Sequence, residues 1–282
     1  MASVAIGTLS LYEAFAFFFI YSFLGWVSEV VFHAFTRGEF ANRGFLNGPV
    51  CPIYGVGVTV ILLILGEWAS KPWLVFLVGL AVPTAIELLA GWALEVFFHN
   101  KWWDYSSRRC NFKGYICLEF SILWGLAVVF VICVLHPAVK WFTSLIPDPY
   151  ATIVTSLLLA GFTADLIVTV LQLLKLNKKL KELDEVTRVM RIGSDAIGKR
   201  VAEAALVVDG KLDTAKEKLS SAREKTIDAI VEKMPKRLLN AFPTLKSRAN
   251  PDAVPLAKER AKKLKKAKKQ SDVQTEEEQS EE

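Results

Sequence analysis

Charged residues are scarce in the first 174 residues of this chain, which carry 8 Lys or Arg and 10 Asp or Glu. The runs 14–24, 56–65 and 122–135 contain no charged residue at all. This scarcity argues against an ordinary soluble domain and indicates membrane-spanning helices. The remaining charge is concentrated from Lys175 onward, so the chain combines an apolar first part with a soluble, basic second part.

Cysteines are also few, and none of the four belongs to a C-x-x-C pair. Cys51, Cys117 and Cys133 lie in or beside apolar runs, where inert packing is expected. Cys110 lies in a loop that we place in the cytoplasm, where a disulfide would be unusual. The first residues show no positive segment and no small-residue cleavage site, so we expect no removable signal peptide.

The apolar runs predict an all-α integral membrane protein whose transmembrane domain comprises residues 1–174. Crossing about 30 Å of hydrocarbon takes about 20 residues, and a backbone in lipid must satisfy its own hydrogen bonds, which favours helix. We predict five transmembrane helices, the second of barely sufficient length. They are 11–35, 52–67, 73–98, 117–136 and 151–174.

The connections between these helices differ in positive charge. The first and third connections and the segment after the fifth helix are rich in Lys and Arg, whereas the second and fourth hold only Lys71 and Lys140. The positive-inside rule then places the N-terminus outside and the C-terminus in the cytoplasm of a multi-pass protein of the cell membrane.

A short motif occurs twice in the chain. Residues 25–33 read Gly-Trp-Val-Ser-Glu-Val-Val-Phe-His, and residues 91–99 read Gly-Trp-Ala-Leu-Glu-Val-Phe-Phe-His. The same offset of 66 residues continues through Arg43 and Arg109. We interpret this as an internal duplication of helix pairs, about 11–67 and 73–136. Each copy holds two crossings, so the copies would be parallel and related by an axis along the membrane normal.

Several acidic, histidine and arginine residues lie inside or near the predicted helices. A carboxylate in the bilayer centre costs about 2.5–3.5 kcal/mol, so it marks a site by default, here a substrate or proton path. Hydrogen-bonded links between helices are an equal alternative. The candidates are Glu29, His33, Glu95, His99, Glu87, Glu119, Asp165, Arg43 and Arg109.

The duplicated Glu-x3-His places a carboxylate and an imidazole on one helix face. If the copies converge, Glu29, His33, Glu95 and His99 are weak candidates for a divalent metal site, and neighbouring histidines could pass protons. In the structural alternative, Arg43 and Arg109 pair with these glutamates and fix the loops. We expect no bound metal and no cofactor.

The two predicted cytoplasmic loops combine aromatic, Arg and Asn residues, unlike solvated linkers, and we expect them to be ordered. The residues that mark these loops are Asn42, Asn47, Gly48, Pro49, Trp103, Asp104, Tyr105, Asn111 and Gly114.

After the membrane domain we predict cytoplasmic amphipathic or coiled-coil helices over 175–234 and a disordered tail over 235–282, basic and then acidic. A thin seam with 3-4 spacing supports self-association through this region. It contains Ala205, Val208, Leu212, Ala215, Leu219, Ala222, Thr226 and Ala229. No aromatic residue interleaves the lysines of the tail, so a nucleic-acid partner is not expected.

Residues 23–57 and 87–125 resemble the CmpB family of polytopic bacterial membrane proteins, described as putative ABC-transporter type IV. The first half carries Phe23-Leu24-Gly25-Trp26, Glu29, Asn42-Arg43-Gly44-Phe45-Leu46, Gly48-Pro49 and Cys51-Pro52-Ile53-Tyr54-Gly55. The second half carries Glu87, Gly91-Trp92, Glu95, Trp103-Asp104-Tyr105-Ser106, Asn111, Gly114, Ile116-Cys117 and Trp124-Gly125. The resemblance implies a permease-like transport subunit. No ATPase motif occurs, so an ATPase would be a separate subunit.

Three hypotheses follow for the function. The first is a membrane-embedded transport component of unknown substrate, with the lipid bilayer and a separate ATPase subunit as partners. The second is a membrane-anchored scaffold that acts through its cytoplasmic helices. The third is an intramembrane metal-dependent enzyme, which we favour least because no nucleophile constellation accompanies the acids and histidines.

Overall fold

The computed structural model describes residues 5–6, 9–38, 40–204, 212–242 and 244–280. The chain forms two compact units. The first comprises Met1–Phe97, Lys101–Leu171 and Ala241–Thr244. The second comprises Phe98–Asn100, Gln172–Asn240 and Leu245–Glu282.

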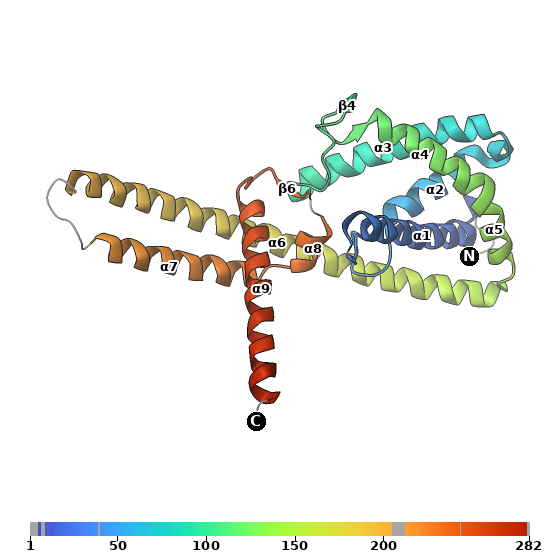
Figure 1. Cartoon of the computed structure of the whole chain (residues 1–282). Coiled ribbons are helices and arrows are strands. Elements are labelled where there is room, and N and C mark those ends of the chain that lie inside the picture. The colour runs from blue at the N-terminus through green and yellow to red at the C-terminus, as the bar shows by residue number, and fades with distance from the viewer. Residues whose placement is uncertain (1–4, 7–8, 39, 205–211, 243, 281–282) are drawn as a thin grey trace. The chain divides into compact units, whose positions relative to one another are not determined.

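The first unit is built almost entirely from helices (Figure 1). They are α1 (Leu11–Arg37), α2 (Pro52–Leu65), a 3-10 helix (Gly66–Ser70), α3 (Pro72–Phe98), α4 (Leu118–Phe130), a π-helical segment (Val131–Leu135), α5 (His136–Ser144) and the first part of α6 (Asp148–Ala204). Short strands are β1 (Ala5–Ile6), β2 (Leu9–Ser10), β3 (Asn100–Lys101), β4 (Asn111–Phe112) and β5 (Ile116–Cys117).

Helix α1 begins where its sequence predicts a cap. The Ser10 side chain accepts a hydrogen bond from the Glu13 backbone N–H at 3.2 Å, and the Glu13 carboxylate accepts from the Ser10 N–H at 2.9 Å. This reciprocal capping satisfies backbone donors that the first turn leaves open. Helix α2 begins with Pro52, whose missing N–H costs nothing at that position.

Among the described residues, four helical segments are long and apolar enough to cross a membrane: Leu11–Thr36, Pro72–Phe98, Leu118–Ser144 and Pro149–Val189. The prediction of a mostly helical, multi-pass membrane protein is therefore confirmed. The predicted span 52–67 is a helix of only 14 residues, which is about 21 Å long at 1.5 Å per residue. A helix of this length does not by itself show that the segment crosses the membrane.

The core of the first unit forms where α1 and α2 pack together and where α3 meets α4. Glycines allow both contacts. A Cβ at Gly55 would lie 2.1 Å from the Ser22 hydroxyl, and one at Gly79 would lie 2.6 Å from the Cβ of Val128. Small residues at such contacts are typical of membrane helix packing. The described residues do not show helix pairs related by a two-fold axis.

The segment Ala241–Thr244 belongs to the first unit because it packs on Trp102. The indole of Trp102 is buried, with the Phe242 ring 4.4 Å and the Phe45 ring 5.6 Å away between centroids. The Thr244 hydroxyl donates to the Trp102 carbonyl at 3.1 Å. The segment Ala241–Thr244 therefore packs on the start of the loop after α3, at Trp102.

The second unit contains the rest of α6, α7 (Leu212–Glu232), most of α8 (Lys236–Ala241), β6 (Lys246–Ser247) and α9 (Ala253–Ser280). Asn177 of α6 holds the segment Phe98–Asn100, because its amide donates to the Phe98 carbonyl at 2.9 Å and accepts from the Asn100 amide. The core of this unit is aliphatic. Its buried residues are Leu173, Leu176, Leu180, Leu183, Ile227, Val231, Met234, Leu238, Leu239, Leu245, Ala253, Val254 and Ala257.

This core differs from the sequence expectation in two respects. On α7 the buried side chains include Ile227 and Val231, whereas Thr226 of the predicted seam is exposed, as are Ala222 and Ala229. No coiled coil is shown among the described residues, and Ala205 and Val208 lie outside them. The tail expected to be disordered contains α8 and α9, because its few aliphatic residues join the core despite the surrounding Pro and Lys.

Candidate functional site

Glu29, in the second half of α1, is held by two partners. The Tyr54 hydroxyl donates to its Oε1 at 2.7 Å, and the Arg43 Nε lies 3.5 Å from its Oε2. The side chains of Glu29 and Arg43 are 29% and 27% exposed. Arg43 therefore does pair with Glu29, as the structural alternative expects, and this pair fixes the loop after α1.

Both copies of the repeated motif hold a tyrosine in the same manner. A Cβ at Gly25 would lie 2.3 Å from the Tyr54 ring, and one at Gly91 would lie 3.0 Å from the Tyr115 ring. In each copy the tyrosine hydroxyl donates at 2.7 Å to the glutamate four residues after the glycine, Glu29 or Glu95. We call each Gly-x3-Glu a glycine–glutamate cradle.

The two tyrosines are not equivalent in the duplication. At the 66-residue offset, Tyr54 corresponds to Phe120, and Tyr115 corresponds to Pro49. The cradles are repeated, but different positions of the chain fill them. Sequence reasoning missed both tyrosines, although a glycine one helical turn before a glutamate is a signal that could have indicated a ring-sized gap beside an acceptor.

Glu87 is the most buried carboxylate among the candidates, with 7% of the residue exposed in the middle of α3. The Tyr105 hydroxyl donates to its Oε1 at 3.0 Å, and the Trp124 indole N–H donates to its Oε2 at 3.4 Å. In the described part of the chain, no Lys or Arg forms an ion pair with it. Glu87 is therefore an acid held by neutral donors within apolar helices.

The Glu87 and Glu29 groups are connected through aromatic side chains. The rings of Tyr54 and Trp124 meet edge to face with centroids 5.7 Å apart. Burial raises the pKa of Tyr105, and the neighbouring carboxylates of Glu87 and Glu29 raise it further. Tyr105 consequently remains a protonated donor at neutral pH, and both carboxylates lie within electrostatic reach of it.

Asp165 of α6 binds the loop before α2. Its Oδ1 accepts from the Asn47 N–H at 3.1 Å and from the Asn47 amide at 2.8 Å, and its Oδ2 accepts from the Gly48 N–H at 2.7 Å. The Thr169 hydroxyl lies at 3.3 Å. A pocket of 520 Å³ runs from this loop between α1 and α6, lined mainly by apolar side chains. Asp165 is thus engaged in fixing the loop.

The other candidates are dispersed. His33 is buried, whereas His99 is exposed with a left-handed φ of 54°. Glu119 pairs with Arg108 at 3.1 Å, and Arg109 is exposed. Across the residues that the structure describes, no group of three or more His, Cys, Asp or Glu could hold a metal ion. The weak metal candidates Glu29, His33, Glu95 and His99 are not assembled into such a group.

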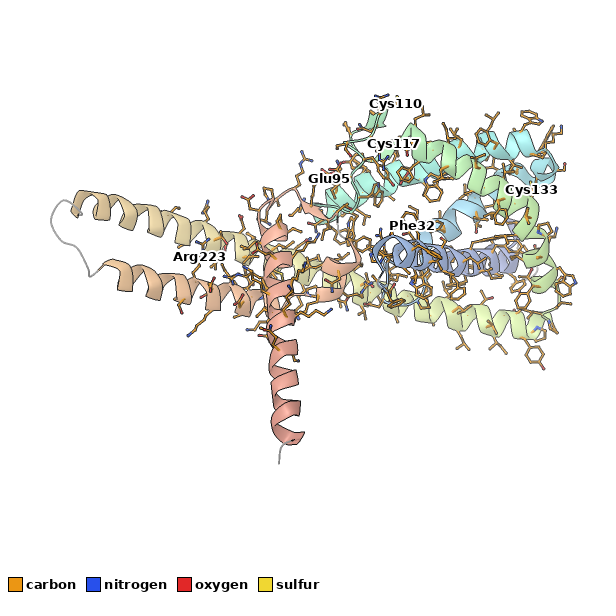
Figure 2. The ribbon with its side chains drawn as sticks, in the orientation of Figure 1. Phe32, Glu95, Cys110, Cys117, Cys133 and Arg223 are labelled. Atoms are coloured by element: carbon orange, nitrogen blue, oxygen red, sulfur yellow. The ribbon has the colours of Figure 1, made fainter. Side chains whose placement is uncertain are left out.

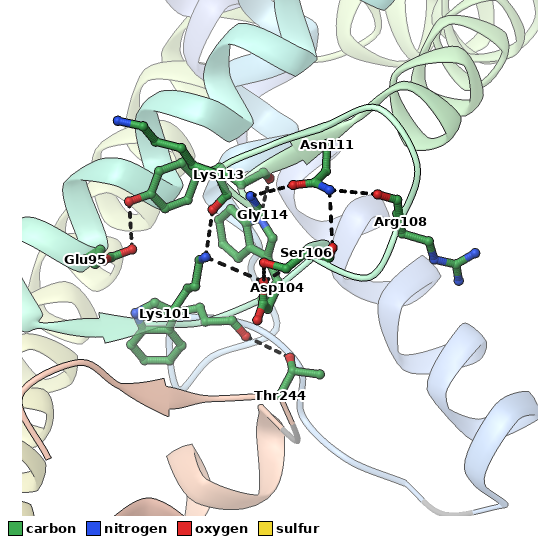
Figure 3. Close-up of polar contacts among 12 residues, drawn as sticks. Glu95, Lys101, Asp104, Ser106, Arg108, Asn111, Lys113, Gly114 and Thr244 are labelled. Carbon is green, nitrogen blue, oxygen red and sulfur yellow. Dashed lines mark hydrogen bonds and ion pairs between the residues drawn. The ribbon is translucent and has the colours of Figure 1, made fainter. Parts of the chain in front are cut away.

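Both loops expected to be ordered contain hydrogen-bonded networks. In the first loop, the side-chain Oδ1 of Asn42 accepts from the Trp26 indole N–H at 2.8 Å and from the Gly44 N–H at 3.0 Å. The side-chain Nδ2 of Asn42 donates to the Asn47 backbone carbonyl. In the second, Figure 3 shows the network around Asp104 and Asn111. Figure 2 places Cys110 on this second loop.

Comparison with known proteins identifies one family. The model described as "Putative ABC-transporter type IV" (CmpB) matches residues 16–170, which is more than half of the chain. No curated protein and no solved structure matches. The matched region overlaps all four apolar helical segments and contains both cradles, Glu87 and Asp165. The chain therefore belongs to the putative ABC-transporter type IV family of membrane proteins.

Proposed function

We propose that the first unit is a membrane-embedded transport component whose proton path includes Glu87 and Glu29. The observation that carries this proposal is the environment of Glu87: a buried carboxylate, neutral donors from Tyr105 and Trp124, and an aromatic contact between Trp124 and Tyr54. Ionising a carboxylate that is buried from water and has only neutral donors is costly, so uptake of a proton there is favoured.

The remaining acids support this assignment by contrast. Asp165 accepts hydrogen bonds from a loop, and Glu119 forms an exposed ion pair with Arg108. Both carboxylates are therefore engaged in structural contacts. Glu95, His33, His99 and Arg109 remain proposed members of the path, at its cytoplasmic end. We place the N-terminus outside and the C-terminus in the cytoplasm, with a separate ATPase subunit as the expected partner.

Proton flux into vesicles tests the proposal without knowledge of the substrate. The full chain is reconstituted in liposomes that contain a pH-sensitive dye, and a potassium diffusion potential, negative inside, drives proton entry. We expect acidification above that of empty liposomes, and we expect Glu87→Gln to reduce it at least tenfold. Glu119→Gln is the matched control, because it removes an acid outside the network.

Equal rates in wild-type and Glu87→Gln vesicles, or wild-type rates no higher than those of empty liposomes, would refute the proton path. Thermal stability of each variant in detergent separates this outcome from misfolding. If flux and stability fall together, Tyr105→Phe discriminates, because it keeps the ring and removes only the hydroxyl that bonds Glu87.

The second candidate function is a scaffold that acts through the second unit. The observation that favours it is the exposed face of α7, where Ala222, Thr226 and Ala229 are not covered by the rest of the unit. A second copy could pack there. Cross-linking of the reconstituted chain tests this: Ala222→Glu with Ala229→Glu should abolish dimers if this face pairs, and should leave cross-linking unchanged if it does not.

A further inference from the structure

The loop between α3 and α4 forms a hairpin whose position relative to the bilayer follows from the chain. The segments Pro72–Phe98 and Leu118–Ser144 are both long and apolar enough to cross a membrane, so the residues between them lie at the membrane surface. Within this loop, β4 pairs with β5 in antiparallel fashion, with Asn111 opposite Cys117. The hairpin therefore stands where lipid headgroups are found.

A dense set of internal hydrogen bonds fixes the hairpin (Figure 3). The Asp104 carboxylate accepts from the Ser106 N–H at 3.1 Å and lies 3.5 Å from the Lys101 amine. That amine also donates to the Lys113 carbonyl at 2.7 Å. Gly114 has a φ of +71°, and a Cβ there would lie 2.4 Å from Asp104 Oδ1, so only glycine fits. These bonds lie inside the hairpin, and they engage the Asp104 carboxylate.

The exposed side chains of the hairpin and of its junction with α4 include cations and apolar groups. Arg109 and Lys113 are exposed, and in the described chain no carboxylate forms an ion pair with either. Phe112 is 53% and Leu118 is 51% exposed. The Lys113 amine lies 5.8 Å from the centre of the Phe112 ring. Figure 3 shows the Lys113 side chain extending away from the internal network.

The backbone of Lys113 adds an independent observation. Its φ is +51°, a left-handed conformation that side chains other than Gly, Asn and Asp rarely adopt. Such a conformation is retained only when the surrounding structure determines it, and here it directs a cationic side chain outward from a surface loop. Gly or Asn would adopt this backbone conformation at a lower cost in free energy. The presence of lysine here therefore calls for a role of its positive charge.

We propose that the outward face of the hairpin, formed by Arg109, Phe112, Lys113 and Leu118, binds anionic phospholipid. The two cations contact the phosphate, and the two apolar side chains rest against the upper acyl region. Cations near an anionic membrane surface are attracted, and aromatic rings favour the interface. Arg109 is also placed at the cytoplasmic end of the proposed proton path, but lipid binding is measured without proton flux, so the two proposals can fail separately. In the described chain no hydrogen bond or ion pair joins the four residues to Glu29 or Glu87.

Lipid titration of the full chain in neutral detergent tests this proposal. The melting temperature is followed as phosphatidylglycerol or phosphatidylcholine is added. Phosphatidylglycerol should stabilise the wild type at lower concentration than phosphatidylcholine. Arg109→Gln with Lys113→Gly should raise the phosphatidylglycerol midpoint about 30-fold, from about fivefold for each charge. Glycine adopts the left-handed backbone conformation at position 113 without strain, so we do not expect this variant to unfold.

Matched variants make the result specific. Lys71→Gln with Lys140→Gln also removes two exposed cations, one just before α3 and one on α5, and should leave the midpoint unchanged. Arg109→Lys with Lys113→Arg keeps both charges and should restore wild-type binding. Equal midpoints for the two lipids in the wild type, as expected if this face binds a protein subunit instead, would overturn the proposal. An unchanged midpoint in the hairpin variant would also overturn it.

Discussion

Gly25 lies on α1 at the point where the ring of Tyr54 crosses the helix backbone. The ring could not approach a larger residue, and without that approach its hydroxyl could not reach Glu29. The glycine therefore provides space rather than backbone freedom, and the same holds for Gly91 beneath Tyr115. A carboxylate near the membrane thereby acquires a neutral donor, which reduces the cost of burying it.

Gly25→Ala should destabilise the protein by about 1–3 kcal/mol, because the added methyl overpacks the contact with Tyr54. Gly57→Ala is the matched control: Gly57 is also a buried helical glycine, but apart from its neighbours and the nearby backbone of its own helix, no described atom lies within 4 Å of its Cβ position. Its effect should be neutral or slightly stabilising, because alanine favours helix. Unfolding in SDS mixtures measures both variants. Equal stability of the two would show that the Gly25 cradle is not tightly packed.

At the scale of elements, Asp165 joins two parts of the chain that are more than 100 residues apart. One carboxylate accepts two backbone N–H groups and one side-chain amide from Asn47 and Gly48. These donors belong to the loop that leads into α2, so α6 determines where α2 begins. A loop without such a partner would leave these donors to water or lipid, which is unfavourable near a membrane.

Asp165→Asn should therefore loosen this loop. The substituted amide places an N–H group toward a backbone donor, and each lost bond to a charged acceptor costs about 1.5–3 kcal/mol. We expect lower thermal stability and faster amide exchange at Asn47 and Gly48. Thr163→Ala is the control on the same helix, because the Thr163 hydroxyl bonds only its own helix at Leu159. Unchanged exchange in Asp165→Asn would contradict the assignment.

For the whole molecule, the sequence predicts the helices better than the contacts between them. Spans such as 73–98 are marked by apolar runs of sufficient length, and the observed α3 begins one residue earlier. The alanines at heptad spacing on α7 lie on a face that is exposed within the chain, whereas the side chains that α7 buries include the larger Ile227 and Val231. Carboxylate positions could be predicted, but the tyrosines that hold them come from other elements and depend on tertiary packing.

The number of membrane crossings depends on α2. The helix alone reaches about 21 Å, and the 3-10 helix Gly66–Ser70 adds about 10 Å, which together match the hydrocarbon thickness if they run in line. If α2 crosses, both basic loops lie on one side of the membrane. If it does not, the loop after α1 and the hairpin lie on opposite sides, and the positive charges are divided between the two faces.

Cysteine labelling distinguishes these topologies. Cys110 is exposed, and probes at Phe40 and Ser70, both exposed, are introduced singly after Cys110 and Cys133 are changed to serine. Cys51 and Cys117 are buried, and burial together with Glu29 raises the pKa of the Cys51 thiol to about 12, so at pH 8 it stays protonated and unreactive. Denaturation in SDS should expose both and serves as the control.

A membrane-impermeant maleimide applied to intact cells should then modify only the probe in Ser70→Cys, and broken cells should show labelling of Cys110 and of Phe40→Cys as well. This pattern requires that α2 cross the membrane and that both basic loops face the cytoplasm, as their Arg and Lys content predicts. If Phe40→Cys is labelled in intact cells and Cys110 is not, the two loops lie on opposite sides of the membrane, and α2 does not cross it. The two cradles would then lie at opposite faces of the bilayer, and Glu29 and Glu95 could not share one end of a path.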